Sequence, residues 1–163
     1  MSLLRFVQWL NQTPGSVLIR ESDWIFPIIE TVHILALSIS VGLILWVDLR
    51  LIGLGMRRET VSDVLEQLKW WTRAGFAVMF LSGSLLLYSE PLKCYNAASF
   101  RLKMLFLALA GVNALVFHTT TYRSVGAWDR DTAAVPLRAK LAGYFSLTLW
   151  LAVIIAGRWT AYF

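Results

Sequence analysis

Long apolar runs alternate with short polar segments along this chain. The apolar runs cover residues 25–47, 70–88, 102–117 and 141–155. A helix needs about 20 mainly apolar residues to cross a bilayer, and an open strand would leave its backbone groups unsatisfied in lipid. The pattern therefore predicts an all-α fold, an integral membrane four-helix bundle with up-down-up-down topology. Its spans are expected at about residues 25–50, 68–89, 101–122 and 138–160.

Two shorter stretches carry apolar residues at helical spacing. Between the first two runs, positions 61, 64, 65 and 68 are all apolar, so the second helix is expected to begin early. Near the N-terminus, the same spacing predicts a short helix over residues 3–11 that lies in the membrane interface. A poorly ordered tail is the alternative for that segment.

The segment DRDTAAVP, residues 129–136, is the clearest linker in the sequence. No internal repeat divides the chain, so we expect one transmembrane domain over residues 1–163. The early segment FVQWL is too short to be the hydrophobic region of a cleavable signal peptide.

Composition agrees with a membrane protein, because 58% of the residues are hydrophobic, and the net charge of +5 is mostly a signal of topology. Nine lysine and arginine residues lie in the two loops that join the first to the second and the third to the fourth span, against six on the opposite side. The positive-inside rule then places both termini outside the cytoplasm. The basic residues lack the aromatic interleaving of a nucleic-acid surface, so no nucleic-acid partner is expected.

Glu30 and His33 lie one helical turn apart in the first span, on the face that also carries Ser40. An ionisable residue within a span costs about 3 kcal/mol on insertion scales, so each is expected to have a partner. Arg158 should lie at a similar depth, which predicts a Glu30–Arg158 ion pair, with separate snorkelling to water as the alternative. Asp48 is expected to pair with a neighbouring arginine, either Arg73 or Arg50.

His33 and His118 are the two histidines of the chain, and they lie on different predicted helices. Two such histidines can be the axial ligands of a b-type heme, with Glu30 and Arg158 orienting the first ligand or contacting a propionate. Counting from the outer helix ends puts them about 12 Å apart in depth, so a heme shared across a symmetric dimer is a second arrangement. The alternative is a hydrogen-bonded polar cluster without a cofactor.

Other metal chemistry finds little support in the sequence. A single E-x-x-H motif is present, whereas a di-iron bundle needs two such motifs and two further carboxylates. The chain has one cysteine, Cys94, and neither a CxxC nor an HExxH motif. Asn113 is expected to bond across to another helix.

Three segments carry a resemblance to known proteins: PIIETVHILALSISVGLILWVDLRLIG, SFRLKMLFLALAGVNALVFH and SLTLWLAVIIAGRWTAYF. They resemble a family of small, uncharacterised bacterial inner-membrane proteins with four helices. More distantly, the layout is similar to the cytochrome b561-like and copper-resistance D-like membrane proteins. That resemblance implies heme binding by His33 and His118, although b561-type proteins carry two histidine pairs and this chain has two histidines in all.

The sequence thus predicts a multi-pass protein of the bacterial inner membrane that binds heme b or serves as an electron-transfer subunit of a membrane redox complex. Its surroundings would be the lipid bilayer, with further copies of itself or the subunits of a larger complex as partners. The alternative is a non-catalytic membrane anchor or assembly subunit that packs against partner helices. A transporter is disfavoured because no span is broken.

Overall fold

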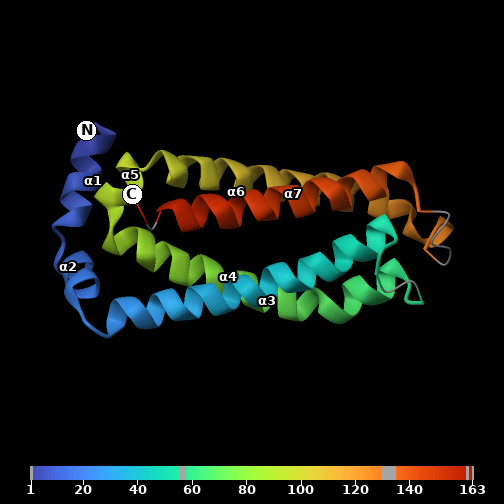
Figure 1. Cartoon of the computed structure of the whole chain (residues 1–163), viewed down its shortest axis with the longest axis horizontal. Helices are drawn as coiled ribbons and strands as arrows, with labels where there is room; N and C mark the ends of the chain where they lie inside the picture. The colour runs from blue at the N-terminus through green and yellow to red at the C-terminus, as the bar shows by residue number, and fades with distance from the viewer. Residues whose placement is uncertain (1, 56–57, 130–134, 161, 163) are drawn as a thin grey trace.

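The computed structural model describes residues 2–55, 58–129, 135–160 and 162, and these residues form helices and no strands. In chain order the elements are α1 (Leu3–Asn11), α2 (Pro14–Glu21), α3 (Ile25–Ile52), α4 (Val61–Ser89), α5 (Pro91–Asn96), α6 (Ala98–Val116), η1 (Phe117–Thr121), η2 (Tyr122–Ala127) and α7 (Leu137–Thr160). Figure 1 shows the four long helices side by side. The all-α prediction is confirmed.

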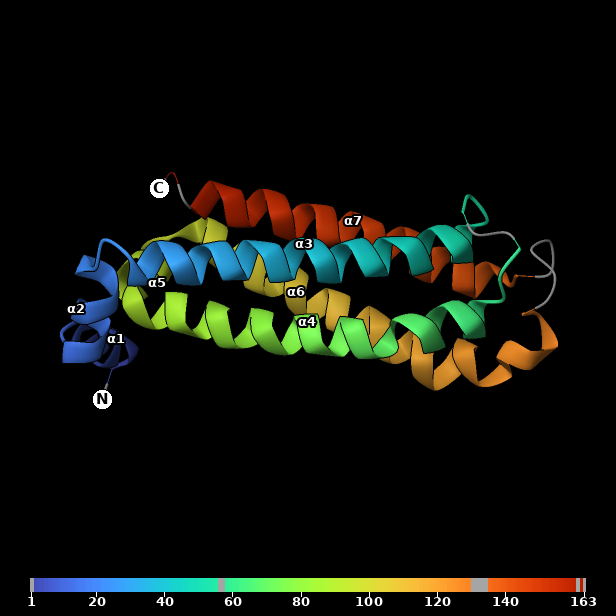
Figure 2. The ribbon, with the colours of Figure 1, turned by 90° about the horizontal axis from the view of Figure 1, so that it is seen from below.

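Two antiparallel hairpins make up the bundle. Helix α3 packs along α4, and α6 packs along α7. Helix α3 also packs against α7 and so joins the two hairpins, which Figure 2 shows with α3 between α4 and α7. Both chain termini lie at one end of the bundle with α1, α2 and α5, and we call it the terminal end. The opposite end, where α3 connects to α4 and η2 to α7, is the loop end.

Among the described helices, three are long and apolar enough to cross a membrane: α3, the continuous helical segment Ala98–Ala127, and α7. These helices indicate a multi-pass membrane protein. Four spans were predicted from the sequence, and α4 is the one that does not qualify. Its first half carries Asp63, Glu66, Lys69 and Arg73, which lower its mean hydropathy, although the helix is 29 residues long.

Large apolar side chains point outward all along the bundle. Leu81 of α4 is 70% exposed, Leu115 of α6 is 63% exposed and Leu151 of α7 is 59% exposed. Exposing so much apolar surface to water is energetically unfavourable, whereas the same surface is stable in contact with lipid.

Hydrogen bonds to one buried acid hold the loop end together. The Asp129 carboxylate accepts hydrogen bonds from the backbone N–H groups of Val61 and Ser62, at 2.5 and 3.1 Å, and from the Ser62 hydroxyl. Arg50 donates through Nε to the Glu59 carbonyl and through a terminal nitrogen to the Asp129 carbonyl. Asp129 begins the predicted linker, of which residues 130–134 lie outside the described residues.

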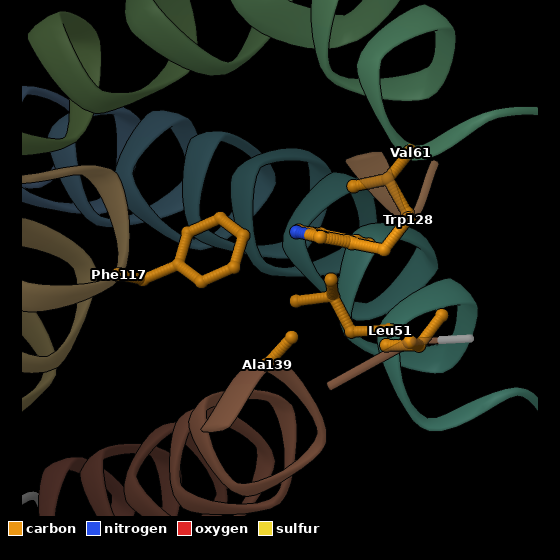
Figure 3. Close-up of a cluster of buried hydrophobic side chains, with 6 residues drawn as sticks. Leu51, Val61, Phe117, Trp128 and Ala139 are labelled. Atoms are coloured by element: carbon orange, nitrogen blue, oxygen red, sulfur yellow. The ribbon is translucent and has the colours of Figure 1, made fainter. Parts of the chain in front are cut away.

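A small apolar cluster lies at the same end of the bundle (Figure 3). It gathers side chains from α3, α4, η1, the segment after η2, and α7, namely Leu51, Val61, Phe117, Trp128, Val135 and Ala139. The predicted early start of the second helix is confirmed, since α4 begins at Val61 and buries both Val61 and Val64.

Helices α1 and α2 close the terminal end. The predicted helix over residues 3–11 is confirmed as α1, and α2 follows it although the sequence reading did not predict it. Arg20 of α2 donates to the Ser89 carbonyl at 2.9 Å, where it meets the negative end of α4. The Thr13 and Tyr88 hydroxyls are 2.8 Å apart. The two short helices are thereby tied to α4.

The third predicted span changes helix type near its end. It was expected to run to about residue 122, and the α-helix stops at Val116, where a π-helical turn and then a 3₁₀ segment continue it. Thr119 and Thr120 donate to carbonyls four residues back, at 2.8 and 2.6 Å, and such bonds compete with regular helix geometry. His118 lies in this π-helical turn.

Candidate functional site

A cavity of about 610 Å³ lies in the half of the bundle nearer the loop end. Residues of α3, α4, α6, η1 and α7 line it. Helices α4 and α6 form its open side, because over their described lengths these two are not a closely packed pair.

Close contacts at small residues explain why the space opens there. A Cβ atom on Gly75 of α4 would collide with the Ser40 hydroxyl of α3, so these helices touch almost backbone to backbone. A Cβ atom on Gly143 of α7 would lie 3.2 Å from the Asp48 carbonyl oxygen of α3. The Asn113 amide of α6 donates to the Ala142 carbonyl of α7 at 2.9 Å, which confirms its predicted bond to another helix. Helix α3 thus packs closely against both α4 and α7, whereas the described residues of α4 and α6 make no comparable contact with each other.

Asp48 is the most deeply buried acid of the cavity wall, with 4% of its surface exposed. Ser146 of α7 is its hydrogen-bonding neighbour. Its second carboxyl oxygen, Oδ2, has no hydrogen-bond partner among the described residues. A buried polar atom without a partner costs about 1–3 kcal/mol, so this oxygen is an acceptor in need of a donor.

The predicted pairing of Asp48 with an arginine is wrong for the described side chains. Arg50 turns away toward the Glu59 and Asp129 carbonyls. The Arg73 guanidinium lies over the Trp70 ring, 5.3 Å from its centroid. Successive residues of a helix face different directions, which sends Arg50 to the loop end while Asp48 faces the bundle interior.

Polar side chains surround the part of the cavity nearest the loop end. Lys69 forms an ion pair with Glu66 one helical turn earlier, and both line the cavity with Thr72 and Arg73. On the opposite wall, the His118 ring meets the Tyr122 ring edge-on with centroids 5.4 Å apart.

The other end of the cavity is apolar. Phe76 of α4 and Trp150 of α7 meet there with ring centroids 5.7 Å apart. Trp150 belongs to the second buried cluster of the bundle, with Ala36, Met79, Ala110 and Val153. This apolar layer separates the cavity from the half of the bundle nearer the terminal end.

His33 lies in that other half and does not line the cavity. Its Nδ1 is 3.0 Å from the Ser82 hydroxyl of α4, and its ring rests on Gly83, where a Cβ atom would lie 3.0 Å from Cε1. The predicted face is confirmed to this extent, since both His33 and Ser40 point toward α4.

Glu30 and Arg158 do not form the predicted ion pair. Both are exposed, and within the described residues neither is in an ion pair. The Arg158 guanidinium donates to the Tyr162 hydroxyl at 3.0 Å and lies over the same ring. Each side chain reaches outward from its own helix, as in the snorkelling alternative.

A heme ligated by both histidines does not fit this arrangement. Phe117, the residue before His118, belongs to the same buried cluster as Leu51, which lies eighteen residues beyond His33 on the same helix. At 1.5 Å per residue, the two histidines are about 27 Å apart along the bundle, well beyond the 12 Å expected from the sequence. Across the described residues, no group of three or more His, Cys, Asp or Glu side chains could hold a metal ion. The separation of about 27 Å along the bundle is too large for one heme iron to bind both histidines of one chain.

Among the residues that line this cavity, His118 is the one that the sequence predicted as a site residue. Asp48 and Asn113 were noticed, but as structural groups, and Ser146 was not considered. A polar residue within a span was the available signal for all three. What brings them together is the packing of α3 and α6 on α7, which the sequence pattern does not specify.

Comparison with known proteins identifies a family without a known role. The model of a family described as "Family of unknown function (DUF6644)" matches residues 7–163. No curated protein and no solved structure matches the chain.

Proposed function

The chain belongs to this family of unknown function, and from its geometry we propose that it binds an amphipathic small molecule within the membrane, in the cavity between α4 and α6. The observation that carries the proposal is the cavity itself. Its volume of about 610 Å³ lies within the range of about 300–1,000 Å³ that is usual for ligand pockets.

The lining of the cavity suits a molecule with two unlike ends. Asp48, Lys69 and His118 line the part near the loop end, and Phe76 and Trp150 lie at the other end. A ligand with a polar head toward the loops and an apolar body toward the bundle centre would match both.

The open side of the cavity offers an entry from lipid. Phe80 of α4 lines it and is 59% exposed, and Gly111 of α6 lines it and is also exposed. An apolar tail could extend between these helices into the bilayer without displacing a packed helix contact.

We further propose that α4 is the fourth span, because the chain needs a return path. Helices α3 and α6 run in the same direction along the bundle, so α4 must bring the chain back between them. The polar start of α4 lies at the loop end and its apolar half lies deeper. With the bias of lysine and arginine toward the loops, this orientation puts the loop end in the cytoplasm of a bacterial inner membrane.

An electron-transfer role through one heme shared by His33 and His118 receives no support from the site. The anchor or assembly role is the alternative that remains if the cavity is empty in the native protein. A search for a native ligand separates this role from the proposed function.

The test is native mass spectrometry of protein extracted with its surrounding lipid by an amphipathic polymer. We expect one amphipath to stay bound to the wild type at the gas-phase energy that strips bulk lipid. Gly111→Phe should lose it, because Gly111 lines the cavity and open space surrounds its Cβ position. Gly42→Phe is the matched control, since this mid-span glycine also has open space and does not line the cavity.

Two results would count against the proposal. One is a wild-type protein that keeps no amphipath beyond bulk lipid. The other is a bound molecule that Gly111→Phe and Gly42→Phe retain equally, because it would then lie elsewhere on the bundle.

A further inference from the structure

We propose that Asp48 selects the ligand, and that the cavity takes amphipaths whose head donates a hydrogen bond through an amine or a hydroxyl group. This inference rests on the proposed function and names the chemical class of its ligand. It is carried by the free Oδ2 atom of a carboxyl group that is 4% exposed and lines the cavity.

Among the described residues, no side chain donates a hydrogen bond to that oxygen. Arg50 is engaged with two backbone carbonyls, Lys69 with Glu66, and Arg73 with the Trp70 ring. Ser146 has a single hydroxyl proton to offer the carboxyl group. A carboxylate has lone pairs on two oxygens and Ser146 can supply a proton to one of them, so the carboxyl group keeps an acceptor for a donor that enters beside it.

The position of Asp48 fits a head group better than a tail. It lies opposite Ser146, and Trp150 follows Ser146 by one turn of α7, about 6 Å deeper into the bundle. A head bound at Asp48 would therefore have its body against Trp150 and Phe76, where the lining is apolar.

The same oxygen works against heads that can only accept hydrogen bonds. When Asp48 is ionised, an ester or a carboxylate head has no proton to share with it, and a carboxylate head would add charge repulsion. Amine and hydroxyl heads both supply the missing donor. They differ in charge, which permits a test of each.

A buried hydroxyl oxygen without a partner among the described residues, that of Ser40, provides a control for this reasoning. Ser40 is packed against Gly75 in the α3–α4 contact and does not line the cavity. Ser40 thus shares the burial of Asp48, and it differs from Asp48 in lying outside the cavity wall.

The experiment uses three probes with twelve-carbon chains and a photoreactive diazirine in the chain: an amine, an alcohol and a methyl ester. The full-length protein in lipid nanodiscs is irradiated with each probe, and labelling of the cavity walls is quantified by peptide mass spectrometry. In the wild type we expect the amine and the alcohol to label Phe76, Phe80 and Leu107 about tenfold more than the ester. This is the difference in affinity that one hydrogen bond to a charged group produces.

Two variants of Asp48 separate charge from hydrogen bonding. Asp48→Asn keeps an acceptor oxygen and loses the charge, so labelling by the alcohol should persist while the advantage of the amine falls. Asp48→Leu removes the acceptor and should leave the three probes equal. Leucine is larger than aspartate, and the cavity that Asp48 lines has room for the extra atoms. Ser40→Ala should label like the wild type.

The outcomes distinguish this inference from the proposed function. Equal labelling by all three probes in the wild type, abolished by Gly111→Phe, would overturn the role of Asp48 and leave the ligand site standing. Labelling of the cavity walls by none of the probes, with Gly111→Phe indistinguishable from the wild type, would overturn both.

Discussion

The Asp129 carboxylate accepts a hydrogen bond from the Val61 backbone N–H at 2.5 Å, across 68 residues of chain. The first N–H groups of a helix have no partner within the helix. Asp129 satisfies two of them on α4, from the segment that leads into α7, and its charge also faces the positive end of that helix. One side chain thus ties the second hairpin to the first at the loop end.

Removing this carboxylate should destabilise the bundle. We expect Asp129→Ala to lower the free energy of unfolding by about 1–3 kcal/mol, because it leaves buried N–H groups without partners. Asp129→Asn should cost less, since the amide oxygen can still accept one bond. The measurement is unfolding of the detergent-solubilised protein by SDS titration. Asp63→Ala, at an exposed acid in the first turn of α4, is the control, and an equal loss in it would refute this role.

The α3–α4 contact at Gly75 should be intolerant of any side chain. Gly75→Ala places a methyl group on the Ser40 hydroxyl, and overpacking of this kind costs about 1–3 kcal/mol. Ser40→Ala in the same protein should recover part of the loss, because it removes the oxygen that collides. Gly42→Ala, with nothing within 4 Å of its Cβ position, should not destabilise in the same SDS titration. Failure of Ser40→Ala to rescue would show that the clash is not the cause.

Much of the helical layout was predictable from the sequence. The apolar run from residue 25 marks the start of α3, and Gly53 marks its end. Gly53 has a positive φ of 81°, which glycine adopts readily. The spacing of apolar residues also indicated the early start of α4. Helix α2 was missed, although Thr13 followed by Pro14 is a start signal that could have revealed it.

The cavity was not predictable, for a physical reason. A helix in lipid is apolar on nearly every face, so its pattern does not say which side meets a neighbour. Gly143 allows α7 to approach α3 closely at Asp48, and this approach places Ser146 of α7 next to the Asp48 carboxyl group. The relative depth of the two histidines was underestimated at the same step, because the sequence does not show where α6 ends against α3.

Cys94 lies in α5 at the terminal end and should react slowly with thiol reagents. Burial raises the pKa of its thiol above the ordinary value, and the nearby Glu90 charge adds to this, against the opposing effect of Lys103 and Lys93. The native state therefore keeps the thiol proton to higher pH than the unfolded state. This contribution to stability is present below the unfolded pKa and is lost as pH rises through the folded pKa.

The corresponding measurement is the rate of iodoacetamide modification as a function of pH. We expect the native protein to reach half of its maximal rate at a higher pH than the SDS-unfolded protein, because the thiolate is the reactive form. Coinciding profiles would contradict the raised pKa. Since Cys94 is the one cysteine of the chain, no second site complicates the rates.

His33 and His118 should behave as independent residues. They lie about 27 Å apart along the bundle, and effects of substitutions at such separations usually add within about 0.5 kcal/mol. The unfolding free energies of His33→Ala, His118→Ala and the double variant should therefore be additive. By contrast, His33→Ala and Ser82→Ala should be non-additive, because their side chains are hydrogen-bonded at 3.0 Å.

A dithionite-reduced minus oxidised spectrum provides the matching test of cofactor binding. A b-type band that disappears in both single variants of the histidines would show a shared heme, and would require two chains to supply its ligands.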